Sequence, residues 1–223
     1  MILVAFVAAG LSGCAAAAIP LTVAQVGIGG FEAFKLMEIG TGGSVGVAFP
    51  RQNGKTVPPP PLPLVRRVAV WPGNEDEVFL TERLAATKRF SVETPNRVRA
   101  ILADAKITTN FNGLTAGEQY NALRLVCRRT RAGLVLAAQN AGTLTRSNAL
   151  SFQRPEKVTN WELLGFSCAR RRVVWRDAMR LIVKLGDHTP STTAIMKVAG
   201  DAWADRVIAA EADSTSEIGA LNQ

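Results

Sequence analysis

The sequence has little of the material from which most metal and histidine-based catalytic sites are built. It contains one histidine and three cysteines in 223 residues. A metal site needs several such ligands close together. A catalytic histidine needs a nucleophile and an orienting acid within hydrogen-bond reach. We therefore expect a protein that is not an enzyme and that carries no metal ion or other cofactor.

Charge is also absent from the beginning of the chain, because no acidic or basic side chain of the Asp, Glu, Lys, Arg or His type precedes Glu32. Ile2–Leu11 is an apolar run of the length found in secretory signals, and the small residues Ser12 and Gly13 suit a cleavage site. Leu11–Cys14, which reads Leu-Ser-Gly-Cys, resembles the bacterial lipobox. The resemblance implies that Cys14 is lipidated, with palmitate or another fatty acid, and becomes the first residue of the mature chain. The departure from the pattern is that no Lys or Arg precedes the apolar run.

Two other interpretations of this segment stay open. Residues 1–31 contain no charged side chain, and 18 or more apolar residues can span a bilayer as an uncleaved helix. The segment would also suit a buried core helix. Pro20 and the nearby glycines weaken a single straight span, so we favour the lipid anchor. Ala15 would then be the second mature residue, which in related signals implies an outer-membrane lipoprotein facing the periplasm.

The formal charge of +8 lies entirely beyond this segment and indicates an anionic partner. Nucleic acid, a phospholipid surface and another acidic polymer all fit the charge. A nucleic-acid module would present exposed aromatic side chains among its basic residues, or a recognition helix. The tryptophans, at 71, 161, 175 and 203, fall within expected strands and helices and are expected to be buried. We therefore expect no nucleic-acid partner.

Composition divides the chain into four parts. Residues 1–14 are the signal. Residues 15–63 are expected to hold an apolar helix over 21–39, a short hairpin turning at Asn53-Gly54, and a stiff proline-rich spacer. Residues 64–210 form the folded domain, and residues 211–223 form a flexible polar tail.

Strand and helix patterns alternate through residues 64–210. Arg66–Trp71 is a buried-strand pattern, and Thr115-x-x-Glu118 is a capping box that opens a helix. The expected strands are 66–71, 90–93, 134–139, 148–152, 159–169 and 173–185, and the expected helices begin near 75, 95, 115 and 192. This order predicts an α/β (α+β) fold: a mixed sheet with a long C-terminal antiparallel hairpin, packed by about four helices.

These elements resemble a group of bacterial envelope lipoproteins. The group comprises the curli-secretion channel subunit, the penicillin-binding-protein activator lipoproteins and the N-terminal domain of the Tol-system periplasmic protein. The resemblance covers residues 64–210 and is carried by Arg67–Trp71, Phe90–Glu93, Ala132–Leu136, Arg172–Trp175 and Ala202–Ala204. It implies a scaffold, activator or assembly factor.

Cys127 and Cys168 are the two cysteines of the expected domain. Cys127 lies on the inward stripe of a helix, and Cys168 lies on the same strand face as Leu164 and Phe166. A helix packed on that face would bring the two thiols within disulfide range, and an exported chain would oxidise them. Two separate buried thiols remain the alternative.

Two arginine clusters would then lie close together. The first is Arg128, Arg129 and Arg131 at the end of a helix, and the second is Arg170, Arg171 and Arg172 at a hairpin turn. Together they would form a surface for an anionic partner. The alternative is that each cluster is simply a solvated end, since arginines at a helix C-terminus complement the helix dipole.

The sequence thus predicts a lipid-anchored envelope protein that acts as a non-enzymatic scaffold, activator or assembly factor for another envelope protein. One alternative is an auxiliary subunit of an envelope transport complex. Another is a basic nucleic-acid-binding protein.

Overall fold

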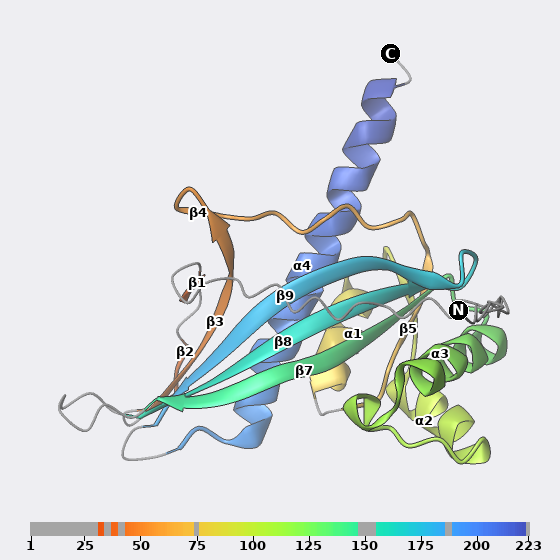
Figure 1. Cartoon of the computed structure of the whole chain (residues 1–223). Coiled ribbons are helices and arrows are strands. Elements are labelled where there is room, and N and C mark those ends of the chain that lie inside the picture. The colour runs from red at the N-terminus through yellow and green to blue at the C-terminus, as the bar shows by residue number, and fades with distance from the viewer. Residues whose placement is uncertain are drawn as a thin grey trace, which may run out of the picture.

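The structure is a computed structural model, and it confirms the predicted fold class: a mixed sheet with helices on both faces (Figure 1). It describes residues 31–33, 37–39, 43–73, 76–146, 155–185 and 189–221. Cys14 and the strand expected at 148–152 lie outside the described residues. The strands are β1 (Phe31–Ala33), β2 (Met37–Ile39), β3 (Gly43–Gln52), β4 (Lys55–Thr56), β5 (Arg67–Val70), β6 (Ser91–Glu93), β7 (Leu134–Arg146), β8 (Glu156–Ser167) and β9 (Arg172–Lys184). The helices are α1 (Asp76–Ala86), α2 (Pro95–Asp104), the 3-10 turn η1 (Phe111–Gly113), α3 (Ala116–Thr130) and α4 (Thr192–Leu221).

The main strand order is β1-β3-β9-β8-β7-β5-β6, with β2 and β4 also paired to β3. β5 is parallel to both of its neighbours, and the other strand pairs are antiparallel. β7, β8 and β9 form the long ribbon at the centre of Figure 1. β8 and β9 are the predicted C-terminal hairpin.

The central strands are apolar on both faces because helices cover both. Val68 and Val70 of β5 face the core beneath α1 and α4, whereas Ala69 and Trp71 face the core beneath α2 and α3. On β7, Leu134 faces the core beneath α1 and α4, and Val135 faces the core beneath α2 and α3. A strand buried on both faces appears in the sequence as a continuous apolar run, which is why this part of the fold was predictable.

Strand β7 is longer than the predicted 134–139. Its outer half, from Asn140 to Thr145, is exposed, so it lacks the apolar alternation that marks a half-buried strand. The outer half forms because β8 pairs with it through Arg146↔Glu156, with an irregularity between Asn140 and Gly142. Long-range pairing therefore decides where this strand ends.

The helix predicted over 21–39 is wrong for the residues that the structure describes there. Phe31–Ala33 and Met37–Ile39 are strands β1 and β2, and both pair antiparallel with β3. Each has a charged residue between two apolar ones, which is the two-residue period of a strand. β3 itself joins the sheet through β9, with Ser44 opposite Lys184. The sheet therefore begins well before the predicted domain boundary at residue 64.

The proline-rich segment is also packed differently from the predicted spacer. We call residues 57–63 the proline strap. Leu62 is 1% exposed in the core, and its N–H donates to the carbonyl of Ala210 on α4 at 3.0 Å. The indole of Trp175 on β9 donates to the carbonyl of Pro60 at 2.8 Å. Proline's fixed φ suits an extended segment, and these bonds hold it against the sheet and α4.

Helix α4 continues to Leu221, so the tail predicted from residue 211 is helical over most of its length. Figure 1 shows this helix crossing behind the sheet and extending past it toward the C-terminus. None of the helices among the described residues is both long enough and apolar enough to cross a membrane.

Candidate anion-binding site

Helix α3 supplies half of the candidate site. Its start is fixed by the predicted capping box: the Thr115 N–H donates to the Glu118 carboxylate at 2.8 Å, and the Glu118 N–H donates to the Thr115 hydroxyl oxygen at 3.4 Å. The backbone hydrogen bond from Thr115, followed by its hydroxyl, lowers the pKa of Glu118. The helix ends at Thr130 and is capped by Arg131, whose φ of 55° lies in the left-handed region. Both ends are therefore set by local chemistry.

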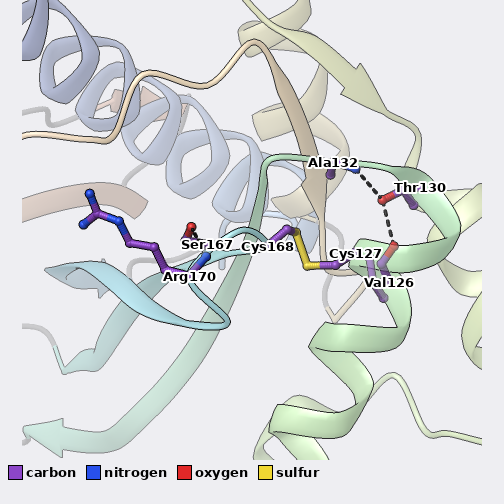
Figure 2. The surroundings of a disulfide bond; sticks show 7 residues. All are labelled: Val126, Cys127, Thr130, Ala132, Ser167, Cys168 and Arg170. Carbon is purple, nitrogen blue, oxygen red and sulfur yellow. Dashed lines mark hydrogen bonds between the residues drawn. A yellow bond between two sulfur atoms is a disulfide. The ribbon is translucent and has the colours of Figure 1, made fainter.

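Cys127 and Cys168 form a disulfide in the structure. Their sulfurs lie 2.01 Å apart, and their Cα atoms 5.5 Å apart. Figure 2 shows the bond joining α3 to the residue that follows β8. The N–H of Cys168 also donates to the carbonyl of Gly133 at 3.0 Å. The turn between β8 and β9 is thus attached to the end of α3 by a covalent bond and a backbone hydrogen bond.

A hollow of about 180 Å³ lies beside this disulfide. Its lining is Arg124, Cys127, Arg128, Phe166, Cys168 and Arg171. Three guanidinium groups therefore border a surface that also contains an aromatic ring and the disulfide. No carboxylate is in the lining, and none of these three arginines forms an ion pair within the described part of the chain.

Of the six arginines predicted from the sequence, the structure brings two to this hollow. Arg128 comes from α3, and Arg171 comes from the β8–β9 turn. The other four, Arg129, Arg131, Arg170 and Arg172, are exposed and do not line it. Figure 2 shows Arg170 extending away from the disulfide, while its N–H donates to the Ser167 hydroxyl oxygen at 3.2 Å.

Sequence reasoning missed Arg124. It lies one turn before Arg128 and one turn after Tyr120, so the three side chains follow one line along α3. The Arg124 guanidinium carbon is 5.5 Å from the centroid of the Tyr120 ring, and that ring packs edge-on against Phe166 at 5.9 Å. The four-residue spacing was the available signal, but Arg124 is not part of an arginine run and so did not stand out.

A second, smaller hollow lies at the carboxyl end of β5, where ligands bind in open α/β sheets. Its lining includes Trp71, Asp76 and Glu77, but its volume is about 10 Å³. That is close to the minimum for one water molecule. Glu77 forms an ion pair with Arg99 at 3.1 Å. This hollow is therefore too small to be a ligand site.

We expect Asp76→Asn to stabilise the protein at pH 8 by about 3 kcal/mol and at pH 4 by less than about 1 kcal/mol. Burial raises the pKa of Asp76 from 3.8 to about 6, although backbone N–H groups oppose the shift. The folded chain therefore holds this proton more tightly than the unfolded chain does. Stability falls as the pH rises from about 4 to about 6, and asparagine mimics the protonated form. Urea denaturation of both proteins across this range measures the effect, and parallel pH profiles would contradict it.

Comparison with known proteins finds similarity only among solved structures. No protein-family model matches the chain, and no curated protein matches its sequence. A Neisseria meningitidis lipoprotein is 12% identical, with a TM-score of 0.39, covering 64% of this chain and 98% of its own. The LpoB C-terminal domain of Escherichia coli is 11% identical, with a TM-score of 0.34, covering 52% and 81%. The PelC dodecamer subunit of Paraburkholderia phytofirmans is 11% identical, with a TM-score of 0.35, covering 74% and 96%. Similarity of this size carries no argument about function.

Proposed function

We propose that this chain is an exported envelope lipoprotein, anchored through a lipid on Cys14, that binds and steadies another envelope protein. The observation that carries the proposal is the disulfide between Cys127 and Cys168. Disulfides persist in oxidising compartments and are rare in the bacterial cytosol. The bond therefore agrees with the export that Leu11–Cys14 predicts from the sequence alone.

The character of the candidate site favours binding over catalysis. The hollow is lined by guanidinium groups, an aromatic ring and a closed disulfide. Arginine stays protonated, so it serves as a hydrogen-bond donor and a fixed charge rather than as a general base. A scaffold, activator or assembly factor that holds an anionic group of its partner fits this chemistry. We place it in the outer membrane, facing the periplasm.

Labelling with a radioactive fatty acid tests the anchor. We expect the intact protein to incorporate label, Cys14→Ser to incorporate none, and Ser12→Ala to keep it, because alanine also fits the lipobox. Membrane fractionation of the labelled protein then tests the assignment to the outer membrane. Absence of label in the intact protein would overturn the proposal, as would label that persists in Cys14→Ser.

A further inference from the structure

The three arginines of the hollow are not explained by their positions in the fold. Arg128 lies in the last turn of α3, where a cation complements the helix dipole. Arg124 lies more than one turn before that end, so the helix dipole does not explain why a cation stands at this position. Arg171 lies in a turn on another element, yet it lines the same hollow. Three like charges gathered without a carboxylate repel one another, so the arrangement is stabilised when an anion binds among them.

The site is also held in place before any ligand arrives. Tyr120 supports the guanidinium of Arg124 at 5.5 Å, and Phe166 supports Tyr120 in turn. The disulfide fixes the turn that carries Arg171 against the helix that carries the other two arginines. Binding therefore requires little additional ordering of Arg124 or of the backbone that carries Arg128 and Arg171, which favours affinity.

The rest of the lining limits the kind of anion. The half-buried Cys168 and its bridge to Cys127 supply apolar surface among the arginines, above the buried ring of Phe166. A ligand that fills the hollow thus needs an apolar group close to its negative charge. The arginine guanidinium is planar and matches the two oxygens of a carboxylate.

The size of the hollow favours a protein segment over other anionic partners. A volume of about 180 Å³ is below the roughly 300–1,000 Å³ of typical small-molecule pockets. Single-stranded nucleic acid needs a groove that follows its backbone, with aromatic platforms for successive bases. A membrane surface needs an exposed basic face and no hollow. One carboxylate beside one apolar side chain is the simplest occupant.

We propose that the hollow binds an acidic segment of a partner protein, in which a carboxylate sits on the three arginines and a neighbouring apolar side chain rests on the Cys127–Cys168 disulfide. This rests on the proposed function, because it takes the partner to be a protein. It specifies the chemistry by which that partner is recognised.

The test uses the full chain purified in detergent and a fluorescent, amidated peptide of alternating glutamate and leucine, followed by fluorescence anisotropy. One comparison peptide replaces glutamate with glutamine, and another replaces leucine with serine. We expect the glutamate–leucine peptide to bind at least about tenfold more tightly than either. Equal binding of all three peptides would overturn the proposal.

Two triple variants separate the site from general charge. Arg124→Gln/Arg128→Gln/Arg171→Gln changes the lining, whereas Arg129→Gln/Arg131→Gln/Arg170→Gln changes exposed neighbours outside it. Each removes the same charge, and each alters one residue of positive φ, Arg171 or Arg131. We expect the first triple to weaken peptide binding by about tenfold or more and the second by less than about threefold. Equal losses would overturn the proposal. If the first triple does not fold by circular dichroism, Arg128→Gln alone is expected to weaken binding by about threefold.

Anionic phospholipid vesicles and single-stranded oligothymidylate are tested in parallel. Tighter binding to either, lost in the first triple and kept in the second, would overturn the proposal and assign the hollow to that partner. The outcome is distinct from the lipidation test. Peptide binding without fatty-acid labelling would refute the anchor and support the assignment of the hollow. Labelling without peptide binding would support the anchor and refute the assignment of the hollow.

Discussion

Replacing Arg206 with methionine is expected to lower the free energy of unfolding by about 3–5 kcal/mol. Arg206 on α4 is 7% exposed, and Asp177 on β9 is 8% exposed. The Arg206 Nη2 donates to Asp177 Oδ1 at 2.8 Å, and its Nε donates to Oδ2 at 2.5 Å. Methionine keeps much of the volume but leaves the carboxylate of Asp177 buried without its partner. That desolvated charge is the main source of the expected loss.

The same arginine holds two further elements. Its Nη1 donates to the carbonyl of Val57 in the proline strap at 2.8 Å. Its guanidinium carbon lies 4.6 Å from the centroid of the Phe49 ring on β3. The loss therefore reaches α4, β9, β3 and the strap together, so it should appear as reduced global stability rather than local fraying.

Arg83→Met is the matched control, because Arg83 forms an ion pair of 3.2 Å with Asp205 on α4 while both side chains are about half exposed. Exposed pairs of this kind contribute about 0–1 kcal/mol. Urea denaturation of both variants measures the difference. The double change Asp177→Leu/Arg206→Met should recover a large part of the loss, because no lone charge then remains. Equal costs at Arg206 and Arg83 would show that burial of the pair does not matter.

Removing the disulfide by Cys127→Ala/Cys168→Ala is expected to lower the free energy of unfolding by about 4 kcal/mol. The two cysteines are 41 residues apart in sequence. A bond that closes a loop of this length restricts the unfolded chain, and its removal restores that entropy to the unfolded state. The folded state should change less, since Cys168 also holds Gly133 through its N–H.

Dithiothreitol supplies the control for this prediction. The reductant should lower the stability of the wild-type protein to near that of the double variant and should leave the variant itself unchanged. A wild-type protein that is equally stable in oxidising and reducing buffer would contradict the prediction. A non-reducing gel, on which only the wild type changes mobility with reductant, verifies that the bond was formed.

The sequence was most informative where one element carries its own signal. The capping box at Thr115 and Glu118 fixes the start of α3, and the apolar run at Val68–Trp71 marks a strand buried on both faces. The stripe that contains Cys127 placed this residue on the inward face of its helix. Each of these signals is complete within a few neighbouring residues, so it can be interpreted without knowledge of the fold.

The sequence was least informative where pairing or packing partners decide the outcome. β1 and β2 are strands because β3 offers them backbone partners, and the alternation in each covers only three residues, which is too short to distinguish a strand from a helix. The proline strap has the composition of a spacer, and only the hydrogen bonds from Trp175 and Arg206 show that it is packed. At the candidate site, Arg124 and Arg171 line the same hollow only because α3 packs beside the β8–β9 turn.

The pairing of β1 with β3 would set how far the domain can travel from a lipid on Cys14. With a lipid on Cys14, residues 15–63 would have been a tether of up to about 170 Å if fully extended. Since the sheet begins at Phe31, only residues 15–30 remain, and their reach is at most about 55 Å. Under the proposed anchor, the β1 edge of the sheet therefore stays within this distance of the bilayer. Lengthening the chain before Phe31 would widen this range without altering the domain.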